Sequence, residues 1–144
     1  AKGFLTLAYE LDVLAGIASE KAAMSVNWGR SAIEGRSVHT PLEHLRAAAG
    51  SGLLGAVVLS GATGTTTAWG GPWSDAHIPP RGDDPALAAS ADSLLGPDEV
   101  AAALALAGPD CLVAVKVAVR PADADVATRV AVARAALAQV GDAR

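Results

Sequence analysis

Aromatic residues and cysteine are scarce in this chain. Only 3% of its 144 residues are aromatic, although 51% are hydrophobic. The core must therefore be built mainly from Ala, Val and Leu, and such small side chains suit helices packed closely against a sheet. The single cysteine, Cys111, excludes an internal disulfide framework and fits a reducing cytoplasm.

Basic clusters and long hydrophobic runs are also missing. The formal net charge is −4, and no stretch concentrates Lys and Arg as a nucleic-acid-binding surface would. No apolar run approaches the roughly 18 residues of a membrane-spanning helix, and no signal peptide is visible. We therefore expect a cytoplasmic protein without nucleic-acid or membrane partners. The chain starts without Met, which leaves open a trimmed start or the cut end of something longer.

Apolar residues follow helical and strand spacings in alternation. The expected strands are 23–28, 54–59 and 111–119, and the expected helices are 5–18, 40–50, 96–107 and 124–140. Strands alternating with helices predict a parallel sheet with right-handed crossovers, so the fold class is α/β. A complete (β/α)8 barrel needs about 250 residues. The single domain 1–144 is therefore part of a barrel, a chain that assembles with a partner, or a small open α/β layer.

The first candidate site follows the first expected strand. Gly29 and Gly35, with charged residues between and beside them, predict a loop over 29–39. In α/β proteins, ligands bind outside the carboxyl ends of strands. Asn27 stands at this strand end, where its amide holds either the loop or a substrate hydroxyl.

Charged residues in this stretch have two interpretations. Glu34 is a candidate base or metal ligand, or it pairs with Arg30 or Arg36. Both arginines suit bidentate contact with a phosphate or carboxylate.

The long passage 60–85 carries the second set of candidates. Asp75 and His77 supply a carboxylate and an imidazole, which suit a divalent metal, or they are a capping Asp and a surface His. Trp69 and Trp73 share this loop, where they stack on a sugar or pack the loop down. Lys116 interrupts an apolar run. We expect it to point inward, where it would bind an anionic group or stabilise an enolate; the alternative is that it points outward with its head in water.

Four motifs resemble an uncharacterised bacterial family that carries the label DUF4862 and is similar to the xylose-isomerase-like barrels. They are Asn27–Ser37 (NWGRSAIEGRS), Pro41–His44 (PLEH), Leu59–Ala62 (LSGA) and Trp73–His77 (WSDAH). The resemblance covers most of the chain from about residue 24 and implies the C-terminal half of a (β/α)8 barrel. Characterised members of the broader superfamily include sugar isomerases, epimerases and endonucleases, often with divalent metals.

The combined prediction is a sugar or sugar-derivative isomerase or epimerase. Its alternatives are a non-catalytic module that binds a sugar or anionic metabolite, and an inactive barrel fragment whose barrel a homo-oligomer would complete. A nucleotide cofactor is not expected, whereas a divalent metal (Mn, Mg, Zn or Co) is compatible with the metal pair. The predicted site residues are Glu34 and Lys116 for catalysis, Asn27, Trp28, Arg30, Arg36, Trp69 and Trp73 for substrate, and Asp75 and His77 for metal.

Overall fold

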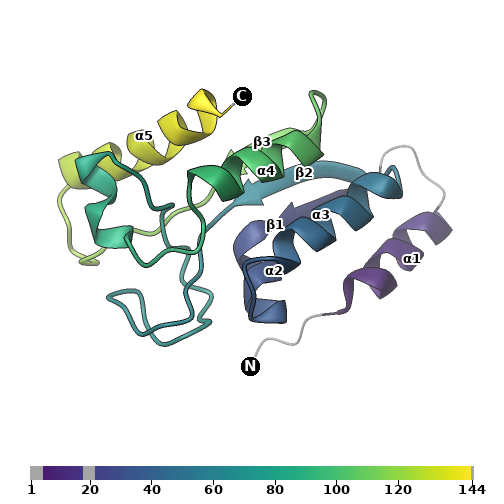
Figure 1. Ribbon diagram of the computed structural model, residues 1–144, viewed down its shortest axis with the longest axis horizontal. Coiled ribbons are helices and arrows are strands. Elements are labelled where there is room, and N and C mark those ends of the chain that lie inside the picture. The colour runs from purple at the N-terminus through teal and green to yellow at the C-terminus, as the bar shows by residue number, and fades with distance from the viewer. Residues whose placement is uncertain (1–4, 18–21, 144) are drawn as a thin grey trace.

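The computed structural model describes residues 5–17 and 22–143, and these form an α/β fold with an open, three-stranded parallel sheet in the order β1-β2-β3. Helices alternate with the strands, as predicted (Figure 1). The elements are, in chain order, α1 (Leu7–Ile17), β1 (Met24–Asn27), α2 (Trp28–Gly35), α3 (Thr40–Gly50), β2 (Leu54–Leu59), η1 (Pro85–Ser90), α4 (Pro97–Ala107), β3 (Leu112–Val115) and α5 (Val126–Asp142). No described helix is long and apolar enough to cross a membrane.

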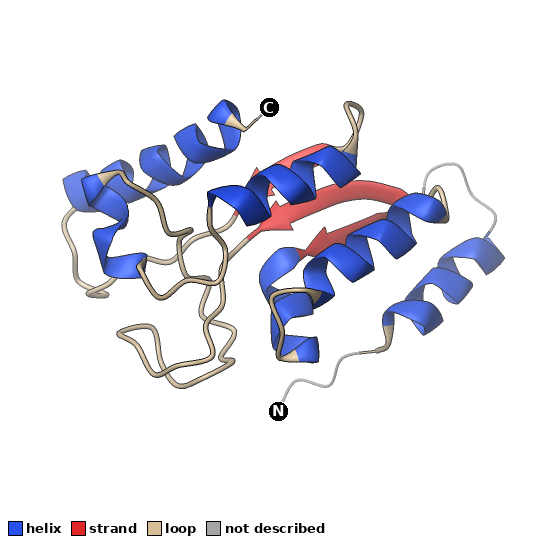
Figure 2. Ribbon diagram, viewed as in Figure 1, coloured by secondary structure: helices blue, strands red, loops and turns tan. Residues whose placement is uncertain are grey.

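The two faces of the sheet differ in burial. Figure 2 shows α3 and α4 lying along one face. Val26 and Val57 belong to the core cluster on this face and are 4% and 0% exposed. On the opposite face, Ser25, Ala56 and Leu112 are register partners, and Leu112 is 68% exposed. We call this second face the open face. It carries Ser25, Asn27, Ala56, Val58, Leu112 and Ala114.

The predicted loop over 29–39 is wrong in its first half, because α2 begins at Trp28 directly after β1. Asn27 caps this helix, since its Oδ1 accepts a hydrogen bond from the Arg30 backbone N–H at 3.1 Å. Arg36 ends the helix in a left-handed conformation with φ 47°. Gly29 is required by close approach, because a Cβ there would lie 2.5 Å from the Ser60 carbonyl oxygen.

Two further boundaries differ from the prediction. The expected third strand, 111–119, pairs as a ladder only over Leu112–Val115. The last helix starts at Val126 rather than Ala124, after its N-cap Asp125. The end of the first expected helix, Ala18, lies outside the described residues.

The core confirms the prediction of small aliphatic packing. Its main cluster joins the covered face of the sheet to α2, α3 and α4, and its largest fully buried members are Trp28, Leu45 and Leu59. A second cluster lies between η1 and α5 and consists of Leu87, Val132, Ala135 and Ala136.

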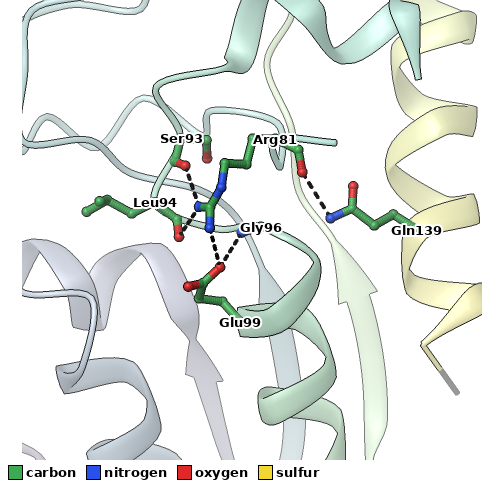
Figure 3. A network of polar contacts seen from close by, with 6 residues as sticks. All are labelled: Arg81, Ser93, Leu94, Gly96, Glu99 and Gln139. Carbon is green, nitrogen blue, oxygen red and sulfur yellow. Dashed lines mark hydrogen bonds and ion pairs between the residues drawn. The ribbon is translucent and has the colours of Figure 1, made fainter. Parts of the chain in front are cut away.

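Arg81 fixes the long connection between β2 and α4 (Figure 3). Its Nη1 donates to the carbonyls of Ser93 and Leu94 at 2.9 and 2.8 Å, and its Nη2 pairs with Glu99 Oε2 at 2.9 Å. The same carboxylate oxygen accepts the Gly96 backbone N–H at the start of α4. These bonds fix the irregular segment around Arg81 to the start of α4.

Candidate functional site

Six of the ten predicted site residues gather in two places. The first, which we call the edge pocket, lies beside β1 and is lined by Asn27, Arg30 and Glu34 together with residues of α1 and α3. The second, which we call the strand-end cluster, consists of Ser60, Asp75, His77 and Lys116 at the carboxyl ends of β2 and β3.

The edge pocket is small. Its volume is about 160 Å³, whereas pockets for small-molecule ligands usually measure about 300–1,000 Å³. His44 on α3 lines it, and its Nδ1 lies 3.0 Å from the hydroxyl of Ser31, which is 5% exposed. His44 is not among the site residues predicted from the sequence. Its spacing of three and four residues from the buried Pro41 and Ala48 is the signal that could have found it.

The strand-end cluster joins the predicted pair Asp75 and His77. Asp75 Oδ1 lies 3.3 Å from His77 Nδ1, and the side chains are 27% and 25% exposed. Ser60, which follows β2 and is 2% exposed, places its Oγ 3.4 Å from the same nitrogen. Sequence reasoning did not single out Ser60. Its position directly after the apolar strand β2 is the signal that was available.

The backbone holds His77 between two strand ends. Next to it, Gly61 and Ile78 exchange backbone hydrogen bonds of 2.8 and 3.2 Å, which return the loop to the end of β2. On the other side, Ala118 N–H donates to the His77 carbonyl at 2.7 Å. His77 itself has φ 54°, a left-handed conformation that costs a residue other than glycine about 1–2 kcal/mol. Such strain persists where the surroundings impose it, as they do in many functional sites.

Lys116 belongs to the same strand end. Its backbone N–H donates to the Leu59 carbonyl at 2.9 Å, so the parallel pairing of β2 and β3 continues one step past β3. By alternation from Leu112 and Ala114, its side chain leaves the sheet on the open face, where it is exposed to solvent. Lys116 is therefore exposed on the uncovered face of the described sheet.

The tryptophans occupy three different environments. Trp28 is fully buried in the main core, so its indole is not placed to stack on a ligand. Trp69 is 7% exposed, and its Nε1 donates to the Ala118 carbonyl at 2.9 Å, which fastens the loop to the segment after β3. Trp73 has φ 57° and lies half-buried against Gly64. The packing interpretation therefore describes Trp69, and the indole of Trp28 presents no open face.

Arg36 stands apart from both groups as the exposed C-cap of α2.

Metal binding at Asp75 and His77 lacks a complete donor set. Within residues 5–17 and 22–143, no group of three or more His, Cys, Asp or Glu side chains could hold a metal ion. A carboxylate that contacts imidazole Nδ1 more often orients a histidine than shares a metal with it.

Comparison with known proteins assigns the chain to a family. The molecule is an α/β protein with an open parallel sheet and a polar cluster at its strand ends. The chain belongs to the family described as "Domain of unknown function (DUF4862)", which it matches over residues 1–132. It is also 45% identical over 80 residues to an uncharacterised protein of Salmonella typhimurium strain LT2, STM3670. That match covers 54% of this chain but only 24% of the relative. No solved structure matches the chain.

Proposed function

We propose that the chain binds a sugar or sugar derivative at the strand-end cluster and takes part in its isomerisation or epimerisation. The observation that carries the proposal is the Asp75–His77 pair, held beside the buried Ser60 hydroxyl at the carboxyl ends of parallel strands. Ligands of open parallel sheets bind at this end of the strands. The clustered hydroxyl, carboxylate and imidazole groups, with Lys116 at the same strand end, match the hydrogen-bonding demands of a polyol.

Proton transfer next to a carbonyl is the chemistry that this cluster suits. With the Nδ1 proton directed to the Asp75 carboxylate, Nε2 of His77 becomes the basic nitrogen of the ring. It would take the proton from the carbon beside the substrate carbonyl, leaving an enediolate. The positive charge of Lys116 would stabilise the developing oxyanion. Return of the proton from His77 to the neighbouring carbon, with the hydroxyl proton of that carbon passing to the first oxygen, completes an isomerisation. An epimerisation would need a second acid that delivers a proton to the opposite face of the same carbon.

Barrel architecture forms the structural part of the proposal. The three strands would be the last strands of a xylose-isomerase-like (β/α)8 barrel, with the open face turned toward the barrel interior. Two features support this arrangement: the strands are parallel with helices on one face, and Leu112 is 68% exposed on the other face. Further β/α units, or the sheet of a second copy, would then close the edges at β1 and β3.

Solvent-exchange NMR tests the catalytic proposal. Aldoses, ketoses and their phosphates are incubated with the protein in D2O, and deuterium entering at the carbon beside the carbonyl is followed. We expect exchange into at least one substrate with the wild type and its loss in His77→Gln. His39→Gln serves as the matched control, because His39 is an exposed histidine remote in sequence from both strand ends. Parallel samples with Mn²⁺ and with EDTA show whether an added metal contributes.

A non-catalytic binding module is the second candidate. Ser60 Oγ and Asp75 Oδ1 both approach the same nitrogen of His77, an arrangement that fixes the ring without forming a nucleophile–base relay. Sugar binding without any deuterium incorporation, weakened in His77→Gln, would favour this candidate over an enzyme.

A further inference from the structure

A second cavity, distinct from the strand-end cluster, lies between η1 and α5. Figure 1 shows these two helices side by side beyond the edge of the sheet. The cavity measures about 490 Å³, within the usual range for a small-molecule site. Its walls are mainly apolar and include Trp69, Pro79, Ala86, Val119, Ala131 and Val132.

Short side chains create this space. The wall from η1 contributes Ala86 and Ala89, and the wall from α5 contributes Ala131. Alanines on both sides leave a gap that the second core cluster, centred on Leu87 and Val132, does not fill. Trp69 also lines the cavity, and its indole is held by a hydrogen bond from Nε1 to the Ala118 carbonyl. The cavity is therefore a preformed pocket bounded by helices and an anchored ring.

Arg120 gives the pocket one cation. Its Nη1 donates to the Val119 carbonyl at 3.1 Å, and it forms no ion pair with any described residue. The nearby acids at the two helix starts are engaged elsewhere. Asp84 Oδ1 accepts the Ala86 N–H at 2.8 Å, and Asp125 Oδ1 accepts the Thr128 N–H at 2.7 Å. A half-buried guanidinium without a carboxylate partner is suited to bind an anion from the ligand.

We propose that this cavity binds a small monocarboxylate that carries an aromatic ring or a branched alkyl group. The apolar part would pack against Trp69 and the alanines, and the carboxylate would pair with Arg120. A sugar does not fit this chemistry, because the apolar walls would leave most of its hydroxyls without hydrogen-bond partners. The proposal uses different residues from the strand-end cluster and stands independently of the proposed function.

The test compares phenylacetate with its neutral analogue phenylacetamide by isothermal titration and saturation-transfer NMR. We expect wild-type protein to bind phenylacetate about tenfold more tightly than phenylacetamide, because only the carboxylate forms a charge-assisted bond. Arg120→Gln should remove this preference while leaving the thermal unfolding midpoint close to wild type. Arg134→Gln is the control, since Arg134 is an exposed arginine of α5 that does not line the cavity.

The second part of the test uses a variant in which the cavity is filled. Ala131→Leu places a larger side chain in the space and should abolish binding of both probes. The proposal is overturned if neither probe binds at millimolar concentration, if Arg120→Gln retains the preference for phenylacetate, or if Ala131→Leu binds both probes as the wild type does.

Discussion

The edge pocket and the strand-end cluster contain similar kinds of side chain but are built differently. In the edge pocket, Arg30 and Glu34 project from the ordinary turns of α2 into about 160 Å³. In the strand-end cluster, His77 is held at φ 54° between the ends of two strands. The first arrangement follows from helix geometry alone, whereas the second needs backbone strain that the surroundings impose. The comparison teaches that a dense run of charges in the sequence is a weaker sign of function than an imposed conformation at a strand end.

Catalytic substitutions give the largest expected difference between the two regions. His77→Gln should lower the rate of deuterium incorporation at least 100-fold, because it removes the proposed base, and general-base catalysis typically contributes about 10²–10⁴. Glu34→Gln should change the rate less than about threefold, since the edge pocket is too small for a sugar. Both rates are measured by NMR under the same conditions, and a large loss in Glu34→Gln alone would reverse the assignment.

Gly29→Ala should disturb both regions at once. Its added methyl group would lie 2.5 Å from the Ser60 carbonyl oxygen, so α2 and the end of β2 must move apart. Overpacking of this kind costs about 1–3 kcal/mol of unfolding free energy. The measurement is urea denaturation.

Gly16→Ala in α1 is the matched control for this substitution, because nothing lies within 4 Å of its new Cβ. Replacing glycine by alanine inside a helix should stabilise the protein by about 0.5–1 kcal/mol. Equal effects of the two substitutions would show that the close approach at Gly29 does not exist.

Two histidine substitutions should separate stability from function. His44→Ala removes the partner of the buried Ser31 hydroxyl and should cost about 1–2 kcal/mol in unfolding free energy. His77→Asn should change stability by less than about 0.5 kcal/mol, because Asn tolerates the left-handed conformation and His77 is partly exposed. Both unfolding free energies are measured by denaturation. A larger loss of unfolding free energy in His77→Asn would show that the strand-end cluster mainly stabilises the fold.

The smallest expected effect lies outside both regions, at the start of α5. Hydrogen bonds from the backbone N–H and then the side chain of Thr128 lower the pKa of Asp125 below its usual 3.8. Because the folded pKa is depressed, the stabilisation is complete above pH 3.8 and is lost as the pH falls through the folded pKa. Asp125→Asn keeps an oxygen acceptor for the cap but does not titrate, so its thermal midpoint should fall less steeply with pH in this acid range. Parallel slopes for both proteins would contradict the prediction.

The sequence predicts well those elements whose pattern is decided locally. The second strand appears over Leu54–Leu59 as expected, because a continuous apolar run is bounded by Gly52 and Ser60. The helix over Pro97–Ala107 also follows the prediction, since Pro97 and Glu99 mark its first turn. In both cases the deciding residues lie within or directly beside the element.

Elements decided by distant contacts are less predictable. The sequence predicts that Gly29 lies in a loop, whereas glycine is needed there because the Ser60 carbonyl approaches it in the fold. The apolar run after Val115 reads as strand, although its backbone pairs with Leu59 and with His77, which lies in an irregular loop. Asp75 and His77 could be named from sequence as a pair, whereas their contact with Ser60 depends on how the loop returns to β2.

The chain's three histidines allow one direct test of where the ligand binds. Long-range ¹H–¹⁵N correlation spectra of the imidazole rings are recorded while the sugar that shows exchange is added. If the strand-end cluster is the site, the ring nitrogens of His77 shift with saturation while those of His44 and His39 stay unchanged. Shifts at His44, with His77 unaffected, would place the ligand in the edge pocket and contradict the account.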